Sequence, residues 1–547
     1  MNVENKIKKM KQEKWALFSV FDKTGVASDA QRLVNMGWKI ISSGGTAKVL
    51  MDAGIPVKDV SELVGGKAIL GNRVVTLSRE VHAALLADAL KSQDLEELEK
   101  LGIPFIDFCR VDFYPMKKII AEANELTDRK AAIAKVIEGT DIGGPCMVRS
   151  AAKGLRIVVC RKQDMIPVLL ELEDTGDICE IKRQELRARA EYEVAMYAAI
   201  SAEFHSLGKF KIIGGARVAS FKGENGPQGP AGLFISDTDN PLSLYNFELI
   251  EGSALSYCNW CDVDRLLHTM PRIAAAWKLN FGYVPRIAIG VKHGNPCGAA
   301  VHSSEMEAAR NMILGDPSAI FGGFIITNFP ITEHIANAMA SNMPDGHARF
   351  DGVIAPAFDK KAIPVLSRKR GKCRLILNPA LAGDYTTIDN FRQVHGGFLS
   401  QPANIFFLDF KHPEISLFGT DKLSMDKKKD LLLAWAIGST SNSNTITLVK
   451  NRMLIGNGVG QQDRVGAAKL AIRRAIDSGK FIEGAAAYSD SFFPFPDAVE
   501  VLIKAGVKTI FSTSGSIKDK EIQELCMEEG IALCQMPDSL ARGFFRH

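Results

Sequence analysis

Two turns near the start of the chain carry residue types that bind phosphate. One turn lies between a predicted strand and a predicted helix and consists of Ser43, Gly44, Gly45 and Thr46. Free backbone N–H groups and the helix dipole favour an anion at such a helix start, and the two glycines let the backbone approach it closely. Ser19 and Lys23 end the neighbouring strand and add a hydroxyl and a positive charge, while Arg73 and Thr76 could complete the cradle. An ordinary strand-to-helix turn would also read S-G-G-T, but two such turns on adjacent strands favour a phosphate site.

A second group of reactive residues begins at Lys292. Lys292 and His293 follow the apolar run R-I-A-I-G-V and precede an N-P-C-G turn, so they would project from the end of a strand. They could supply a positive charge and a general base, although a surface lysine beside a turn-capping histidine would read the same way. Zinc deaminases combine H-x-E with P-C-x-x-C, whereas here no Glu follows His293 at that spacing and Cys297 is followed by G-A-A. We therefore expect no metal.

The elements that must position these residues alternate from residue 15 onward. The predicted strands of the first part of the chain are 15–20, 38–42, 55–60 and 156–160. One predicted helix ends at about residue 36, and a second begins at Ala47. A charged helical stretch covers about 174–204. This strand–turn–helix order predicts a parallel α/β sheet that binds ligands at the carboxyl ends of its strands.

The Gly/Pro-rich segment 206–233 is predicted to be a domain boundary or an ordered entry loop. A second α/β region follows, and a third segment begins at about Leu431. The charged clusters S-R-K-R-G-K-C-R (367–374) and M-D-K-K-K-D (425–430) are interpreted as solvated surface. No exact internal repeat is visible.

Composition excludes several classes of protein. The chain has 547 residues, 46% hydrophobic and 24% charged, and a formal charge of +4, which indicates a globular protein and not a nucleic-acid binder. The ten cysteines form no paired framework, and the lone C-x-x-C of Cys258 and Cys261 is read as structural. The charged N-terminus lacks the apolar core of a signal peptide, and no run reaches a membrane span. We expect a soluble cytoplasmic protein without a membrane partner.

The motifs taken together resemble a bifunctional purine enzyme. SVFDKTG, SGGTAKVLMDAGIPVKDVSEL, NRVVTL, FYP and TDIGG with RSAAK are similar to the IMP cyclohydrolase domain of the family that combines AICAR transformylase and IMP cyclohydrolase. VKHGNPCGAA, AIFGGFI, DGVIAPAF, SNTITLVKN, GVGQQDRV and SDSFFPFPDAVE resemble its transformylase domain. The resemblance implies a methylglyoxal synthase-like parallel-sheet domain at 15–200. It also implies a transformylase region at 206–547 made of two cytidine-deaminase-like α/β halves, about 206–370 and 371–547.

The resemblance assigns formyl transfer to three residues. His293 would be the base, Lys292 would supply charge and protons, and Asn444 would polarise the formyl oxygen of 10-formyltetrahydrofolate, the cosubstrate. Further residues fall in matching motifs and would line the nucleotide and folate pockets: Asn259, Asp351, Gln461, Gln462 and Arg464. This half also departs from the family in three places. The entry motif reads F-K-G-E-N-G-P-Q, no Lys lies two to five residues before Asn444, and Asp463 replaces a Ser.

For ring closure the resemblance points to Tyr114, Asp141 and Lys153. The family motif R-V-K-T-L reads R-V-V-T-L here, so Val75 stands where relatives carry a Lys for phosphate and catalysis. Arg79 could replace the lost charge only from a different position. We therefore expect weakened cyclisation.

The sequence predicts an enzyme of de novo purine biosynthesis that acts on small nucleotides and forms a homodimer, the last from the resemblance alone. It would formylate AICAR to FAICAR and cyclise FAICAR to IMP weakly. Two alternatives stay open: a nucleotide-binding regulator without catalysis, and a related enzyme acting on a modified aminoimidazole nucleotide.

Overall fold

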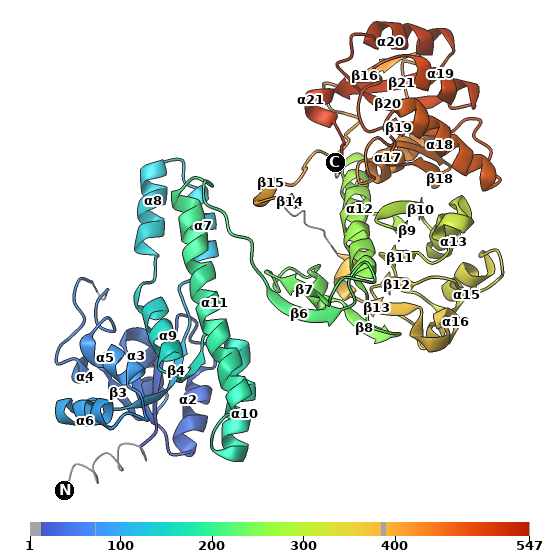
Figure 1. Ribbon diagram of the computed structural model, residues 1–547. Helices are drawn as coiled ribbons and strands as arrows, with labels where there is room; N and C mark the ends of the chain where they lie inside the picture. Colours follow the sequence, from blue (N-terminus) through green and yellow to red (C-terminus); the bar gives the residue numbers. More distant parts are fainter. Residues whose placement is uncertain (1–12, 72, 384–389, 546–547) are drawn as a thin grey trace. The chain divides into compact units, whose positions relative to one another are not determined.

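The computed structural model describes residues 13–71, 73–383 and 390–545, and the chain divides into two compact units between Gly214 and Gly215. The first unit is drawn in blue to green in Figure 1. It contains a five-stranded parallel sheet with the strand order β3-β2-β1-β4-β5. Its strands are β1 (Trp15–Ser19), β2 (Lys39–Ser42), β3 (Val57–Asp59), β4 (Ile106–Val111) and β5 (Ile157–Val159). Strands β2 and β3 are added on one side of β1, and β4 and β5 are added on the other. The carboxyl ends of β1 and β4 therefore flank the crevice where such sheets bind ligands.

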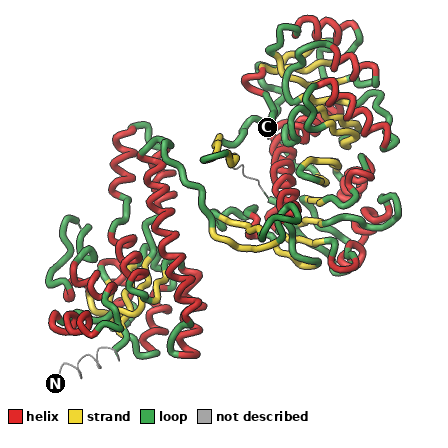
Figure 2. The backbone as a smooth tube through the Cα atoms, viewed as in Figure 1, coloured by secondary structure: helices red, strands yellow, loops and turns green. Residues whose placement is uncertain are grey.

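Helices surround this sheet, as Figure 2 shows. They are α2 (Val26–Asn35), α3 (Gly44–Asp52), α4 (Val60–Leu63), α5 (Arg79–Leu86), α6 (Ser92–Leu101), α7 (Met116–Asn124), α8 (Arg129–Glu138), α9 (Gly143–Lys153), α10 (Met165–Thr175) and α11 (Glu180–His205). Ala16, Leu17 and Phe18 of β1 are fully buried, which fits a strand covered on both faces. The predicted strands are present, but α3 begins at Gly44 and not at Ala47. The S-G-G-T turn is therefore a cap plus the first helical turn.

The second unit is built on one twelve-stranded sheet. Its order is β16-β21-β20-β19-β17-β18-β10-β9-β11-β12-β13-β8. The strands of its first half are β8 (Glu248–Glu251), β9 (Arg286–Lys292), β10 (Asn295–His302), β11 (Phe324–Thr327), β12 (Gly352–Ala355) and β13 (Arg374–Leu377). Those of its second half are β16 (Ser416–Phe418), β17 (Ile446–Lys450), β18 (Met453–Gly458), β19 (Ala486–Ser489), β20 (Thr509–Ser514) and β21 (Ala532–Pro537). Two hairpins lie outside the sheet: β6 (Ala216–Phe221) with β7 (Ala231–Ile235), and β14 (Asn390–Val394) with β15 (Gly397–Gln401).

The helices of the second unit follow the same division. They are α12 (Tyr257–Phe281), α13 (Glu305–Gly315), α14 (Pro317–Ile320), α15 (Glu333–Ser341) and α16 (Ala362–Leu366), then α17 (Met425–Gly438), α18 (Arg464–Asp477), α19 (Asp497–Lys504), α20 (Asp519–Glu528) and α21 (Asp538–Ala541). Residues of α12 and α17 share one apolar core on one face of the sheet. The other face is covered by one core around α13 and α15 and another around α18 and α19.

The two halves repeat one arrangement, as the resemblance implied, although the sequence shows no exact internal repeat. Each half consists of an edge strand, a long helix, an antiparallel hairpin and then three mutually parallel strands. In chain order, β8-α12-β9-β10 corresponds to β16-α17-β17-β18. The central strands β10 and β18 join the halves as antiparallel neighbours, with Ala300 opposite Met453. Strand β13 pairs with β12, so the first half extends beyond the division predicted at about residue 370.

Candidate active sites

The predicted phosphate turn lies at the start of α3, beside the carboxyl end of β1. Ser43 is extended and occupies the N-cap position, but its side chain makes no capping hydrogen bond. The first amides of α3 have no acceptor within the helix. The Thr46 hydroxyl is buried, and it bonds both the amide and the carbonyl of Val20 at 3.1 Å. Thr46 therefore fixes α3 against β1. The amides of α3 and Lys23 are the candidate anion-binding groups.

Lys23 brings a positive charge to this helix start. Its Nζ donates to the Val20 carbonyl, and its Cε lies 3.7 Å from where a Cβ on Gly45 would be. Partial burial lowers the pKa of Lys23, and this effect outweighs the carboxylates of Asp112 and Asp22. A phosphate bound here would add a further negative charge beside Lys23 and favour its charged form.

Arg73 and Thr76 lie with α8 and α9. Arg73 pairs with Glu138 at 2.8 Å, and both side chains are exposed. Thr76 is buried, and its Oγ1 would be 2.7 Å from a Cβ on Gly143, the first residue of α9. Val75 packs against the apolar core of the unit.

Arg79 does not replace the family lysine in this structure. It begins α5, where its guanidinium pairs with Glu80 at 2.9 Å and its side chain is 74% exposed. Its charge is thus balanced by the neighbouring carboxylate.

Tyr114 and Asp141 form one group beyond the end of β4. The Asp141 carboxylate accepts a bond from the Gly144 amide (2.8 Å) and contacts the Tyr114 amide, while the Asp141 amide donates to the Tyr197 hydroxyl (2.8 Å). Burial raises the pKa of Asp141, although the two amides oppose the shift. Partial burial also raises the pKa of Tyr114, helped by the negative charges of Asp141 and Glu138. Both groups are thus biased towards their protonated forms.

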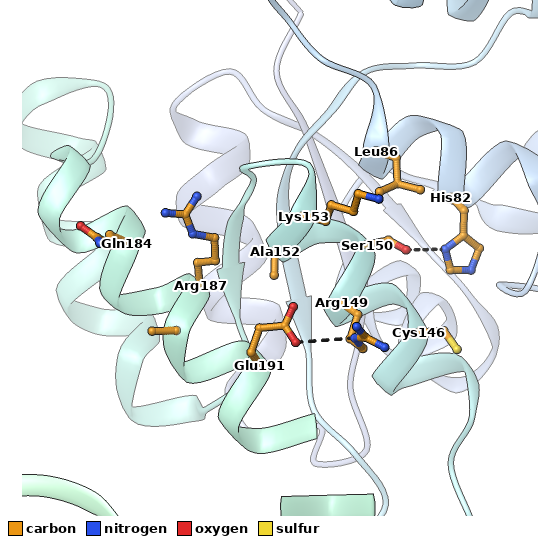
Figure 3. A pocket seen from close by; sticks show the side chains of 11 residues that line it. His82, Leu86, Cys146, Arg149, Ser150, Ala152, Lys153, Gln184, Arg187 and Glu191 are labelled. Carbon is orange, nitrogen blue, oxygen red and sulfur yellow. Dashed lines mark hydrogen bonds and ion pairs between the residues drawn. The ribbon is translucent and has the colours of Figure 1, made fainter. Parts of the chain in front are cut away.

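Lys153 lies elsewhere. It ends α9 and lines a cavity of about 770 Å³ between α5, α9 and α11 (Figure 3). In this cavity His82 bonds Ser150 at 2.8 Å, and Arg149 pairs with Glu191 at 3.5 Å. Asp141 precedes the start of α9, and the helix rises about 15 Å to Lys153. The structure brings Tyr114 and Asp141 together but does not place Lys153 with them.

The Lys292–His293 pair ends β9 at a tight turn. Lys292 Nζ donates to the Phe321 carbonyl at 2.6 Å, and it lies with the Asp351 carboxylate around Gly322. His293 is exposed and has a φ of +52°, a left-handed conformation. The Gly294 amide donates to the carboxylate of Asp262 on α12 at 2.7 Å. Asp262, which the sequence did not single out, fixes the turn that carries the predicted base.

Asn444 lies just before β17 and is fixed on both sides. Its side-chain amide donates to the Gln461 carbonyl at 3.1 Å, and the two backbones also bond each other. The fully buried Asp490 accepts from the Ser443 hydroxyl and from the Thr445 amide (3.0 Å). An amide nitrogen has two hydrogens, so Asn444 keeps one for a substrate oxygen.

The two segments meet across the seam between the halves. The Asn442 amide donates to Asn295 Oδ1 at 3.1 Å, and Asn457 Nδ2 donates to the Pro296 carbonyl at 2.9 Å. His293 and Asn444 each lie two residues from the first of these bonds. The structure thus joins the segment that carries Lys292 and His293 to the segment that carries Asn444, about 150 residues later in the chain.

Phe545, near the C-terminus, packs against the Asn444 segment. Phe545 accepts a bond from the Ser443 amide at 3.3 Å, and its ring covers the buried Arg265 of α12 at 4.1 Å. Arg265 in turn donates to Asn442 Oδ1 at 3.1 Å. No local pattern in the sequence marked this tail or Arg265, because their contacts are long-range.

The remaining predicted pocket residues have mixed positions. Arg464 pairs with Asp490 at 3.1 Å, which makes it a support of the Asn444 segment. Asp351 pairs with Arg368 at 3.2 Å, and Gln462 is exposed. Asn259 is buried and forms a capping box with Ser256 at the start of α12. Asp463, which replaces a family Ser, caps α18 through the Gly466 amide at 2.6 Å.

Two surface interpretations were wrong in part. In the 367–374 cluster Arg368 bonds Asp351 and Cys373 is fully buried. In the 425–430 cluster Asp430 is buried and accepts two amide bonds from the β17–β18 turn. Charge alone did not reveal these tertiary partners.

All ten cysteines are free thiols. Over the described ranges, no set of three or more His, Cys, Asp or Glu side chains is arranged to hold a metal ion. In the same part of the chain no helix is both long and apolar enough to cross a membrane.

Comparisons with known proteins agree with this division. A family model described as the AICARFT/IMPCHase bienzyme matches residues 151–474, and one described as the MGS-like domain matches residues 25–146. The bifunctional purine biosynthesis protein PurH of Persephonella marina is 32% identical over 536 residues, covering 95% of this chain and 97% of its own. PurH of Bacillus cereus strain ATCC 10987 is 34% identical over 531 residues, covering 95% and 98%. A solved structure titled "Crystal structure of ForH" is 29% identical, covers 36% of this chain and 100% of its own, and has a TM-score of 0.31.

Proposed function

The chain belongs to the AICARFT/IMPCHase bienzyme family, and we infer from this membership that it is a purine biosynthesis enzyme that formylates AICAR and cyclises the product to IMP. The observation that carries the assignment is the meeting of the Lys292–His293 turn with the Asn444 segment, in a chain that matches its relatives over nearly their full length. The family match gives no support to a regulator without catalysis.

For formyl transfer we propose that 10-formyltetrahydrofolate is the donor. The AICAR amine attacks the formyl carbon, forming a new C–N bond, and His293 takes the proton that the amine loses. Asn444 donates its remaining N–H to the oxyanion, and Lys292 adds positive charge nearby. The carbonyl then re-forms as the bond from the formyl carbon to the folate nitrogen breaks, and that nitrogen takes a proton that Lys292 supplies. No step requires a metal ion.

The other predicted residues are given supporting or binding roles. Asn259, Asp351, Gln461 and Gln462 are proposed to line the nucleotide and folate pockets, as the family motifs imply. Arg464 acts through Asp490 on the Asn444 segment, since its guanidinium is already paired there.

For ring closure we propose Tyr114 and Asp141 as the acting pair. Burial raises the pKa of the Asp141 carboxyl and so favours the protonated form, the form that donates a proton as the carboxamide nitrogen attacks and water leaves. The substrate phosphate would bind at the α3 amides with Lys23. Lys153 does not lie with this pair in one chain, and Val75 brings no charge, so cyclisation should be the weaker activity.

The substrates are small nucleotides and a folate. A homodimer in the cytoplasm is proposed on the basis of the family alone.

The deciding experiment is product analysis of purified protein with AICAR and 10-formyltetrahydrofolate. Accumulation of the formamide FAICAR supports strong formyl transfer with weak ring closure. Direct conversion to IMP would show that cyclisation is efficient, and no product would overturn the enzymatic assignment. A His293→Ala protein is the control for contaminating activity.

A further inference from the structure

The two halves of the second unit hold their central hairpins in the same way. Below the β9–β10 turn, Asp262 of α12 accepts the Gly294 amide at 2.7 Å and also contacts the His293 amide. Below the β17–β18 turn, Asp430 of α17 accepts the Asn451 and Arg452 amides at 3.2 and 2.6 Å. Both aspartates are buried, at 7% and 5% exposure. A buried carboxylate is thus used twice to fix a turn.

The lysine that ends each first strand repeats as well. Lys292 ends β9 and donates to the Phe321 carbonyl at 2.6 Å, while Lys450 ends β17 and donates to the Phe481 carbonyl at 3.2 Å. The two turns therefore correspond residue by residue, V-K-H-G with V-K-N-R. The residue after the lysine differs: His293 in the first half and Asn451 in the second.

Both turns need help from outside to keep their shape. His293 and Gly294 have φ values of +52° and +69°, and Asn451 and Arg452 have +54° and +60°. Residues with a Cβ disfavour this left-handed region by roughly 1–2 kcal/mol each. A charged acceptor that binds the turn amides offsets this cost, because hydrogen bonds to a carboxylate are stronger than neutral ones.

We propose that Asp262 is a positioning residue for formyl transfer: its carboxylate holds the His293–Gly294 turn so that the imidazole faces the substrate amine. This inference rests on the proposed function. Asp430 holds the β17–β18 turn in the same way, but that turn carries no histidine. Asp430 is therefore a matched control within the same protein.

The charge of Asp262 has a second effect at this position. The charged groups that act on it are His293 on the turn and Asp351 before β12. When His293 takes a proton in the reaction, the nearby carboxylate stabilises the imidazolium that forms. Burial raises the pKa of Asp262 to about 6, so this charge is present at neutral pH.

The first test compares Asp262→Asn with Asp430→Asn by hydrogen exchange of the turn amides in the full-length protein. Asp262→Asn should speed exchange at residues 293–294 and leave residues 451–452 unchanged, and Asp430→Asn should do the reverse. Unchanged exchange at 293–294 would overturn the positioning role whether or not the protein transfers formyl groups.

The second test is kinetic. Asp262→Asn should lower kcat for formyl transfer by about 10- to 100-fold with little change in the KM for AICAR, within the range of general acid–base effects. In the His293→Ala background the same substitution should cause no further loss, because Asp262 acts through His293. Asp430→Asn should leave kcat unchanged.

Three results would contradict the proposal: equal losses from Asp262→Asn with and without His293, a matching loss from Asp430→Asn, or a loss confined to KM. If Asp262→Asn does not fold, Asp262→Glu keeps the charge but moves the oxygens, and it should show a smaller loss of kcat. A wild-type protein without formyl transfer would refute the proposed function, while the exchange data would still decide whether Asp262 holds the turn.

Discussion

At the scale of single residues, the transformylase region shows a division between side chains that face the substrate and side chains that hold them. His293 is exposed on its turn, whereas Asp262 and Asp490 are buried beneath the segments that carry His293 and Asn444. Buried carboxylates are costly unless they are bonded, and here each accepts backbone amides. Substitution of an exposed residue such as His293 should therefore lower kcat, whereas substitution of a buried aspartate should also lower the stability of its segment.

Replacement of His293 by Ala should abolish most formyl transfer. The turn keeps its backbone bond to Asp262, so nucleotide binding is retained while the base is lost, and kcat should fall by about 10²–10⁴-fold. Steady-state kinetics with AICAR and 10-formyltetrahydrofolate measure this loss. His334→Ala, on the exposed side of α15, is the matched control and should leave kcat unchanged. Near-normal turnover of His293→Ala would remove His293 from the mechanism.

Replacement of Val75 by Lys should increase ring closure. Val75 is only partly buried, so a longer side chain can reach solvent, and a charge-assisted bond to the substrate phosphate contributes about 1.5–3 kcal/mol, or roughly 10- to 100-fold in rate. The assay is conversion of purified FAICAR to IMP. Arg79→Ala should change nothing, since Arg79 is paired with Glu80. Efficient cyclisation by the unmodified protein would contradict this prediction and would mean that another cation serves the phosphate.

At the scale of elements, the strands were predictable and their partners were not. Apolar runs such as A-L-F in β1 predict buried strands because the strand interior of a parallel sheet is apolar on both faces. The start of α3 was missed by three residues because glycines rarely begin a helix pattern, although Ser43 occupies the N-cap position here. Asp430 was read as surface because its acceptor role depends on a turn 21 residues later.

The candidate sites show the same limit. The motif order identified Lys292, His293 and Asn444, and the fold brings these segments together. Lys153 lines a cavity at the end of α9, whereas Asp141 precedes the start of this helix. The length of α9 sets the distance between them, and the motif does not show that length.

The C-terminal tail is an element whose removal should affect the chemistry. Phe545 covers Arg265 and accepts the Ser443 amide, and a cation–π contact of this kind contributes about 0.5–2 kcal/mol. Phe545→Ala should therefore loosen the Asn444 segment and lower kcat for formyl transfer by about 2- to 30-fold. Phe544→Ala is the control, because its ring contacts Arg542 instead, and it should have a smaller effect. Equal losses from both variants would show that the tail acts only through general stability.

At the scale of the whole molecule, the two units can be tested for stability separately. In the first unit the Asp107 carboxylate of β4 accepts the Trp15 amide of β1 at 3.2 Å, and burial raises the pKa of Asp107 to about 6. The folded state therefore binds this proton more tightly than the unfolded state. The stability that this group contributes is complete below about pH 4 and is lost as the pH rises through 6.

Asp107→Asn should remove this dependence. Urea unfolding of the wild-type protein between pH 4 and pH 7 should show a loss from this group of up to about 3 kcal/mol, which the variant lacks. The difference between the two proteins isolates Asp107 from Asp262 and other carboxyl groups. Identical pH profiles for both proteins would show that Asp107 is not protonated in the folded state.

The repeated hairpins of the second unit bear finally on descent. A helix and hairpin copied end to end give one polypeptide two frames of the same shape, each with a lysine at the strand end and an aspartate beneath the turn. The two turns share the Val-Lys pair and differ at the next two positions, His-Gly in the first and Asn-Arg in the second. One support thus occurs twice in the chain, beneath a turn that carries a histidine and beneath a turn that does not.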